Sequence, residues 1–456
     1  MQKKTCAQVI ADYAFDLEYG DIPQEIIHAT KMHTLDTLGV ALAGSTTKWA
    51  KIIAKYVKSR KVPGKSTVLN YWNKTRSASA AFANGTFSHS LDYDDDPGIC
   101  HIGAVIVPAS IAIAEELEAN GQELVTAINI GYDVVTRVEE AFDGEAMFKR
   151  GFHPTAVCGV FGAAAAASKI LRLDKEKITN ALGIAGSFAS GLMEFLSDGS
   201  MTKRIHPGWA AQNGIEAAYL AMNGFTGPKT VFEGKHGLKG FSREINSVKL
   251  LVSLGERFDV ARSSLKKYPS CLYNASAIDG ILEFYHKKGI RAEDVKSIDI
   301  KVRSVAMRLV GDPIKRKYEP QTMLDAQMSM PYSVAVALID GKAYLDQFSE
   351  ERYKTQDVLQ LAKIVRVSID PELDKLPSSD LSTILQLTLK NGSTIKKRVD
   401  IFKGDFRNPL SQNELEEKFR RCSSRVLSSE SVKKLENKIL KIEELKNIRN
   451  LMNNLM

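Results

Sequence analysis

Helical patterns rich in alanine, glycine and serine fill the first half of the chain, and they constrain its fold more than any other feature. The pattern at 155–171, for example, contains a run of five alanines at 163–167. Helices of this kind are apolar nearly all round and let neighbours approach closely, so they belong in the centre of a helical bundle. Similar helical patterns cover 48–60, 77–90, 107–119, 122–142, 174–189 and 208–223.

The periodicity changes near residue 256. Segments 297–303 and 385–389 alternate apolar and polar residues, as half-buried strands do. The second segment runs into Asn391-Gly392, a strong hairpin signal, before a returning strand. Two helical patterns, at 273–288 and 324–340, lie in the same part of the chain as these strands. This mixture predicts a separate α+β domain.

After residue 400 the pattern is helical again, over 412–422 and over a long amphipathic stretch near 429–449. The apolar stripe of that stretch consists of Leu435, Ile439, Ile442, Leu445 and Ile448. We expect this stretch to pack back on the first domain. The sequence therefore predicts a mainly α fold: a large all-helical domain made of 1–255 and 401–456, with a smaller α+β lid domain inserted at 256–400.

Composition narrows the class of protein. The chain has 456 residues, a net charge of +8 and five scattered cysteines without a CxxC pair. This argues against a zinc ribbon, an iron–sulfur cluster and a disulfide framework, and favours a reducing compartment. No apolar run approaches 18 residues and no signal peptide is recognisable, so we expect a cytoplasmic protein without a membrane partner. The spread of basic residues carries no nucleic-acid-binding signature and fits a small anionic substrate.

The most acidic segment is Leu91-Asp92-Tyr93-Asp94-Asp95-Asp96, which His101 follows closely. The segment lies between two core-like apolar segments, and buried carboxylates need counter-charges or a metal. It is therefore a candidate site. The alternative is a solvated loop whose aspartates cap the next helix. A hard cation held by Asp92, Asp94, Asp95 and His101 is a further, weaker alternative.

Other candidate groups stand at predicted helix starts. His153 precedes Pro154 and so lies near a helix N-cap, where an imidazole can share a substrate carboxylate with backbone N–H groups. Lys203-Arg204 lie in a predicted loop before His206 and can clamp carboxylates. Lys266 is placed to reach a cleft between domains. For any one of the three histidines taken alone, a structural role is the better-supported interpretation, and the basic pair fits a solvated loop equally well. We expect a structural or exposed role for His28, His33, His236 and His286, and His89 is ambiguous.

Seven segments together resemble the MmgE/PrpD family. In chain order they are LDYDD (91–95), HIGA (101–104), GFHPT (151–155), FGAAAAA (161–167), MTKRIH (201–206), KKYPSC (266–271) and SMPYSVA (329–335). The family includes 2-methylcitrate dehydratases, cis-aconitate decarboxylases and iminodisuccinate epimerases. The resemblance implies a helical domain with an α+β lid, a homodimer, and a small di- or tricarboxylate substrate handled without a metal or an organic cofactor.

The resemblance also implies a set of site residues. Its catalytic members are Asp92, His101, His153, Lys203 and Lys266; we add Arg204, His206, Cys271 and Asp96 as substrate-binding residues. We expect a cofactor-independent lyase. The basic residues would stabilise a carbanion, His101 or His153 would move the proton, and Asp92 would orient an imidazole.

Some pocket positions differ from the family pattern. Asp96 stands in place of a usual threonine. Cys271 stands where the decarboxylase branch has a histidine, with none near Ala275, and Met307 lies close to the position of a tyrosine. Dehydration and decarboxylation both stay open, with epimerisation of a dicarboxylate such as iminodisuccinate as an alternative. From a different class, an inactive carboxylate-binding member of the family is also possible.

Overall fold

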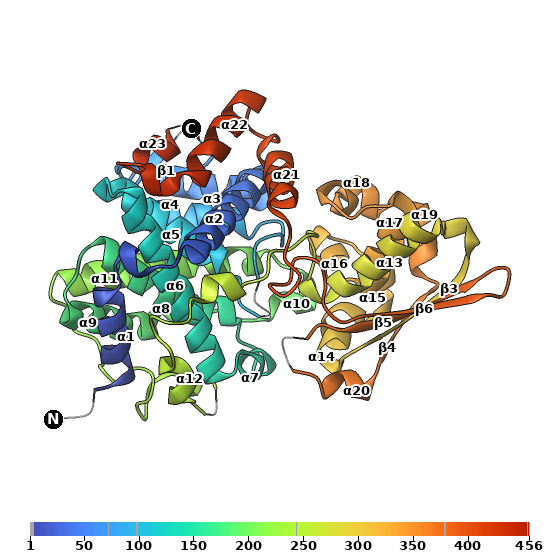
Figure 1. The fold of residues 1–456 in the computed structure, drawn as a ribbon, viewed down its shortest axis with the longest axis horizontal. Helices are drawn as coiled ribbons and strands as arrows, with labels where there is room; N and C mark the ends of the chain where they lie inside the picture. Colours follow the sequence, from blue (N-terminus) through green and yellow to red (C-terminus); the bar gives the residue numbers. More distant parts are fainter. Residues whose placement is uncertain are drawn as a thin grey trace. The chain divides into compact units, whose positions relative to one another are not determined.

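The computed structural model describes residues 4–71, 73–96, 99–242, 244–377, 380–453 and 455. The chain forms two compact units (Figure 1). Unit 1 consists of Met1–Ser90, Asp94–Ser263 and Ser411–Met456, and unit 2 consists of Leu91–Tyr93 and Ser264–Leu410. Unit 1 is almost entirely helical and unit 2 combines helices with a small sheet, so the predicted fold class is confirmed.

Unit 1 is built around helix α8 (Pro154–Ile170), in which nearly every side chain is buried. Around it pack α5 (Gly103–Leu117), α6 (Gly121–Phe142), α9 (Lys175–Phe188) and α11 (Thr202–Met222). The other helices of this unit are α1 (Cys6–Asp16), α2 (Gln24–Gly44), α3 (Lys48–Ser59), α4 (Ser77–Ser88), α7 (Gly144–Lys149), α10 (Phe195–Asp198), α12 (Ser247–Leu251), α21 (Gln412–Ser423), α22 (Ser429–Leu440) and α23 (Arg449–Met452). This unit also contains a two-stranded antiparallel ribbon that the sequence analysis did not predict, made of β1 (Ser66–Val68) and β2 (Asn73–Thr75).

Glycines allow α4 and α11 to approach closely. A Cβ added to Gly208 would lie 2.2 Å from the carbonyl oxygen of Phe82, and one added to Gly85 would lie 2.8 Å from the Cα of Gly208. The backbones of the two helices therefore meet where the small-residue patterns overlap. This contact brings the end of α4 beside the first turns of α11.

Two helices of unit 1 begin earlier than the sequence predicts. Helix α11 begins at Thr202 rather than 208, and α5 begins at Gly103 rather than 107. Both predicted ranges begin next to a proline, yet Pro207 and Pro108 lie inside their helices. Each proline removes one helix hydrogen bond, and tertiary packing outweighs this loss.

The C-terminal stretch predicted near 429–449 is not one helix. Helix α22 ends at Leu440, and only short turns follow it. The N–H of Gly121 donates to the carbonyl of Leu445 at 2.8 Å, and the N–H of Ile448 donates to the carbonyl of Ala119 at 2.9 Å. These backbone bonds to the turn before α6 replace the helix hydrogen bonds. The stretch belongs to unit 1, and α21 and α22 contact α2 (Figure 1).

Unit 2 contains a four-stranded sheet in the order β4-β3-β5-β6. The strands are β3 (Val295–Val302), β4 (Val365–Ile369), β5 (Thr383–Leu389) and β6 (Thr394–Val399). The predicted hairpin pairs β5 with β6 antiparallel, whereas β4, which the sequence analysis missed, pairs parallel with β3. Helices α13 (Ala275–Lys288) and α17 (Met330–Asp340) pack on the sheet and on each other. The shorter helices are α14 (Ser304–Ala306), α15 (Ile314–Tyr318), α16 (Met323–Gln327), α18 (Glu350–Tyr353), α19 (Gln356–Ala362) and α20 (Pro371–Asp374).

Among the described residues, no helix is both long and apolar enough to cross a membrane.

Candidate functional site

The acidic run is buried. Asp92, Asp94, Asp95 and Asp96 each expose at most 5% of their surface. The interpretation of the run as a solvated loop is therefore wrong. Each aspartate must instead be satisfied by partners within the protein, since an unpaired buried carboxylate is costly. The partners differ between the four residues, and so do the roles that they permit.

Asp95 has a structural role. Its Oδ2 accepts hydrogen bonds from the Tyr132 hydroxyl at 2.8 Å and the Ser263 hydroxyl at 2.9 Å, and lies 3.1 Å from His33 Nδ1. Its Oδ1 accepts the N–H of Gly103, the first residue of α5, at 2.7 Å. A carboxylate held on both oxygens in this way anchors the helix start.

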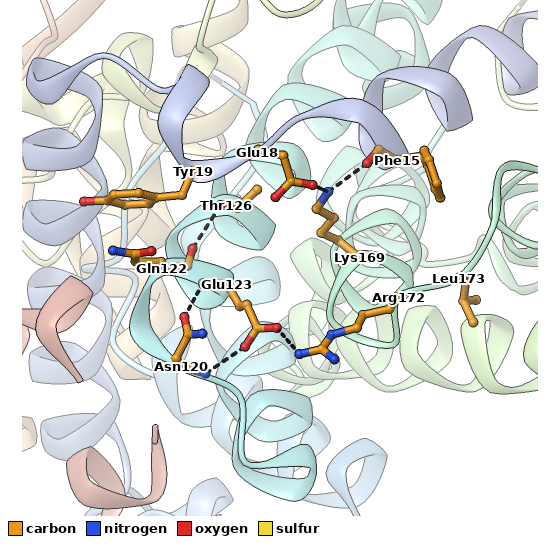
Figure 2. Close-up of a pocket in the computed structure, with 10 residues that line it drawn as sticks. All are labelled: Phe15, Glu18, Tyr19, Asn120, Gln122, Glu123, Thr126, Lys169, Arg172 and Leu173. Carbon is orange, nitrogen blue, oxygen red and sulfur yellow. Dashed lines mark hydrogen bonds and ion pairs between the residues drawn. The ribbon is translucent and has the colours of Figure 1, made fainter. Parts of the chain in front are cut away.

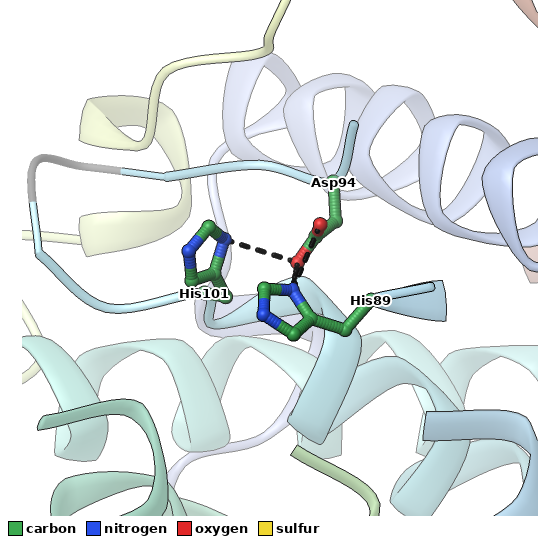
Figure 3. Close-up of side chains that lie close together, drawn as sticks. All are labelled: His89, Asp94 and His101. Atoms are coloured by element: carbon green, nitrogen blue, oxygen red, sulfur yellow. Dashed lines mark hydrogen bonds and ion pairs between the residues drawn. The ribbon is translucent and has the colours of Figure 1, made fainter. Parts of the chain in front are cut away.

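Asp94 lies between two imidazoles (Figure 3). His89 Nδ1 lies 2.9 Å from Asp94 Oδ2 and 3.1 Å from Oδ1. His101 Nδ1 lies 3.1 Å from the same Oδ2, and the two rings are 4.2 Å apart between centroids. All three side chains are buried. Asp94 thus lies against both imidazoles, whereas the sequence analysis considered only Asp92 for the orientation of an imidazole.

The charges of this cluster follow from burial and contact. Burial alone would raise the pKa of Asp94, but His89 and His101 outweigh it and hold that pKa well below its usual value. Burial lowers the pKa of His89 well below its usual value, although Asp94 opposes the shift. At neutral pH the cluster therefore holds an ionised Asp94 beside a neutral His89.

A second pair of imidazoles adjoins the first. His153 is the N-cap of α8 with Pro154 in its first turn, as predicted. Its Nδ1 lies 2.8 Å from Nδ1 of His206, and its Nε2 lies 3.3 Å from the Thr155 hydroxyl oxygen. That hydroxyl also accepts the backbone N–H of His101 at 3.0 Å, which links the two imidazole pairs. The ring centroid of His153 lies 6.2 Å from the ring centroid of His89 and 6.2 Å from that of His101.

These two histidines are neutral at physiological pH. Burial, followed by the neighbouring imidazoles and Lys203, lowers the pKa of His153 well below its usual value. Burial and then Lys203 lower the pKa of His206 to about 4. A neutral imidazole has a lone pair on one ring nitrogen that can accept a proton, so the cluster contains candidate general bases.

Lys203 and Arg204 lie in the first turn of α11 and are buried, so the prediction of a loop is wrong, and so is the alternative of a solvated surface. Arg204 Nη1 donates to the carbonyl of His89 at 3.2 Å, and its guanidinium lies 5.5 Å from the ring centre of Trp49. Lys203 lowers the pKa of three surrounding imidazoles, which places its positive charge within the cluster. Two cations beside neutral imidazoles form a suitable environment for a polyanion.

Asp96 adds a negative group to the cluster. It is buried, and its Oδ2 lies 3.9 Å from Nε2 of His101. This is the position at which the sequence departs from the usual family threonine. Because Asp96 is close to the ring nitrogen that faces away from Asp94, it is placed to affect substrate binding or proton transfer at His101.

The remaining predicted residues belong to unit 2. Lys266 Nζ lies 2.6 Å from Oδ1 of Asp92, and both side chains are almost fully buried. Asp92 has a φ of 52°, in the left-handed region that aspartate tolerates better than most residues. The N–H of Cys271 donates to the carbonyl of Gln327 at 3.0 Å. Two of the predicted catalytic residues, Asp92 and Lys266, therefore form a buried ion pair with each other.

Three ligand-type groups could in principle hold a metal: His89, Asp94 and His101, whose atoms lie within 4.8 Å of one another. Their spacing already has an explanation, because each Nδ1 points at the Asp94 carboxylate at about hydrogen-bond distance. The set suggested from sequence does not match this cluster, since both oxygens of Asp95 accept other hydrogen bonds. The geometry gives no reason to assign a metal here.

A surface pocket of about 410 Å³ lies elsewhere in unit 1 (Figure 2). Its described lining includes none of the predicted site residues. Its cations are neutralised by neighbours: Lys169 lies 3.1 Å from Glu18, and Arg172 lies 2.7 Å from Glu123. The imidazole cluster is therefore the stronger candidate site.

Sequence reasoning missed the roles of His89 and Asp94. Asp94 was one of four aspartates, and no spacing rule separates the one that meets an imidazole from its neighbours. His89 follows the last residue of α4, so its direction depends on how that helix ends and packs. Only the placement of α4 beside α11 and α5 brings these side chains together.

Comparison with known proteins matches both parts of the chain to family models. Residues 8–249 match the MmgE/PrpD N-terminal domain, and residues 268–444 match the MmgE/PrpD C-terminal domain. The chain is 32% identical to cis-aconitate decarboxylase of Homo sapiens, over 98% of this chain and 93% of that protein. It is 30% identical to the Mus musculus protein of the same name, over 98% and 92%, and 27% identical to that of Aspergillus terreus, over 97% and 94%. These relatives are lyases by name.

Proposed function

Because the chain belongs to the MmgE/PrpD family, we propose that it is a cofactor-independent lyase acting on a small di- or tricarboxylate. Decarboxylation of cis-aconitate is the first activity to test. The observation that carries this choice is the 32% identity to a cis-aconitate decarboxylase over nearly the whole of both chains. Dehydration of a substrate such as 2-methylcitrate is the second activity to test.

The imidazole cluster supports this chemistry. When a carboxylate leaves as CO2, its bonding electron pair stays on the substrate carbon, which then takes a proton. Lys203 and Arg204 would bind the carboxylates and stabilise that negative charge. His101 or His153 would move a proton from water to that carbon. In a dehydration the same groups would remove a proton and protonate the departing hydroxyl.

The ion pair of unit 2 contributes Lys266 and Asp92 to the proposal. Lys266 remains a proposed catalytic cation, and Asp92 is its buried counter-charge. Cys271, Asp96 and His206 remain proposed substrate-binding residues. A homodimer in the cytoplasm is likewise part of the proposal.

The test is a substrate screen. Purified protein is incubated with cis-aconitate, methylcitrate, citrate and iminodisuccinate, and the products are identified by NMR. We expect one of the first three acids to lose CO2 or water. Conversion of iminodisuccinate alone would contradict the lyase proposal and favour an epimerase.

The same screen in D2O separates an enzyme from an inactive binding protein. An active base exchanges a substrate C–H proton for deuterium even without net reaction. Complete inertness across the panel, together with measurable binding of the acids, would favour the binding protein.

A further inference from the structure

We propose that His89 and Asp94 are positioning residues for His101: His89 donates its Nδ1–H to the Asp94 carboxylate, and the carboxylate so held fixes His101 with Nδ1 protonated and Nε2 as the atom that exchanges the proton. The contribution to turnover rests on the proposed function. The hydrogen-bond arrangement itself can be measured whether or not that function is correct.

The first argument is the tautomer of His89. Its Nδ1 lies 2.9 Å from an acceptor-only carboxylate oxygen, so this nitrogen must carry the hydrogen. Its Nε2 is buried and finds no hydrogen-bond partner among the residues that the structure describes. The opposite tautomer would set two lone pairs against each other and bury an unsatisfied N–H, which costs more than an unsatisfied acceptor.

The second argument is the shared oxygen. Oδ2 of Asp94 lies 2.9 Å from His89 and 3.1 Å from His101, so the two rings flank one carboxylate oxygen. The His101 contact lacks the alignment of a full hydrogen bond, which is common before a substrate binds. His89 fixes the position of the carboxylate and Asp94 fixes the ring of His101. When His101 becomes an imidazolium, the ionised Asp94 stabilises it.

The third argument is the contrast with His153. Both nitrogens of His153 face uncharged groups, the Thr155 hydroxyl and the His206 ring. It has no carboxylate at hydrogen-bond distance among the contacts described. A proton placed on His153 would therefore lack the stabilisation that Asp94 gives to His101. This distinguishes the two imidazoles that the proposed function leaves as alternatives.

Paired substitutions of His89 test which nitrogen acts. His89→Asn keeps a donor near the Nδ1 position, whereas His89→Gln places one near Nε2 and loses the bond to Asp94. We expect His89→Asn to retain kcat within a few-fold. His89→Gln should lose about 10²-fold in kcat, the scale of a misplaced catalytic group, with KM changed little. Asp94→Asn should lose at least as much. The reverse order of the two His89 variants, or equal effects from both, would overturn the proposal.

His33 supplies the matched control. It is also a buried histidine whose Nδ1 lies 3.1 Å from a carboxylate, that of Asp95, but it has no contact with the cluster's rings among those described. His33→Asn and His33→Gln should differ in stability only, with kcat within a few-fold of wild type. An equal loss of kcat in the His33 variants would show that any buried imidazole–carboxylate pair has this effect, and would overturn the specific role of His89.

The readout independent of activity is NMR of protein labelled with 15N-histidine. The His89 and His101 signals are assigned from their loss in single variants. We expect both rings to carry hydrogen on Nδ1 in the wild type, and Asp94→Asn to disturb this state in at least one. A wild-type His89 protonated on Nε2 would overturn the proposal even if the variants fail to fold. If the tautomers are as expected but no tested acid is turned over, the proposed function is contradicted and the hydrogen-bond arrangement is not.

Discussion

Lys203 is the residue that most directly links the imidazole cluster to the proposed polyanionic substrate. Burial is the main cause of the lowered pKa of His89, His153 and His206, and the nearby Lys203 lowers the pKa of each ring further. A cation fixed in the first turn of a helix needs little reorganisation when negative charge develops on the substrate.

Substitution of Lys203 should therefore affect turnover more than binding. Removing one preorganised group of this kind commonly costs about 10²–10³-fold in rate. We expect Lys203→Ala to lower kcat by at least that factor while the protein stays folded. Lys267→Ala is the control, because its ammonium lies over the ring of Tyr268 at 5.7 Å rather than in the cluster. Equal, mild effects from both variants in steady-state assays would contradict the site.

The low pKa of His206 predicts a pH-dependent stability. Between about pH 6.5 and pH 4 the unfolded chain binds a proton at this histidine and the folded protein does not, so acidification favours unfolding. His206 alone should cost about 3 kcal/mol over this interval, since one pKa unit corresponds to about 1.4 kcal/mol. The expected slope is about 1 kcal/mol per pH unit near pH 5.

Urea denaturation at several pH values measures this slope. His206→Gln should have a shallower dependence of the free energy of unfolding on pH than wild type, with His28→Gln as a control for removing an exposed histidine. An unchanged slope in His206→Gln would show that His206 is not buried as a neutral ring.

At the scale of elements, the glycine contact between α4 and α11 determines where the cluster forms. His89 follows the end of α4, and Lys203 begins α11. A Cβ on Gly208 would meet backbone at 2.2 Å, and backbone cannot rotate away as a flexible side chain can. The two helices must separate to accept it.

Gly208→Ala should therefore destabilise the protein by about 1–3 kcal/mol, the usual cost of overpacking a core. Chemical denaturation measures this loss, and kcat should fall with it because the cluster is displaced. Gly20→Ala is the control, since an added Cβ there meets nothing within 4 Å. No loss of stability in Gly208→Ala would mean that the helices are further apart than described.

The sequence predicted most elements because their patterns are local. Apolar periodicity located α6 and α8 within one residue, and Asn391-Gly392 located the β5–β6 hairpin. The errors occurred where tertiary contacts overrule local signals. Pro207 was read as a helix start, β4 was missed beside its parallel partner β3, and the helix after Leu440 was replaced by backbone bonds to another turn.

The sequence also predicted part of the candidate site. His101, His153, Lys203, Arg204 and His206 were singled out from sequence, and unit 1 brings them into one buried neighbourhood. Asp94 and His89 could not be selected because their role depends on which side chains meet across helices. The exposure of the acidic run was equally uncertain, since a charge run does not show in sequence whether partners will cover it.

At the scale of the whole molecule, family membership and the cluster lead to one chemical account. Two family domains cover nearly the whole chain, and unit 1 contains imidazoles, a carboxylate and two cations in contact. Such a set can bind a polycarboxylate and move a proton with its own side chains. The account therefore expects activity that depends on Lys203 and not on an added metal.

The most direct measurement of this claim is CO2 release from cis-aconitate by purified protein after exhaustive EDTA treatment, compared with untreated protein and with Lys203→Ala. The account predicts equal release from the first two and a loss of about 10²-fold or more in the variant. Release that disappears with EDTA and returns with a divalent metal would contradict it, and would make the His89, Asp94 and His101 cluster a metal site.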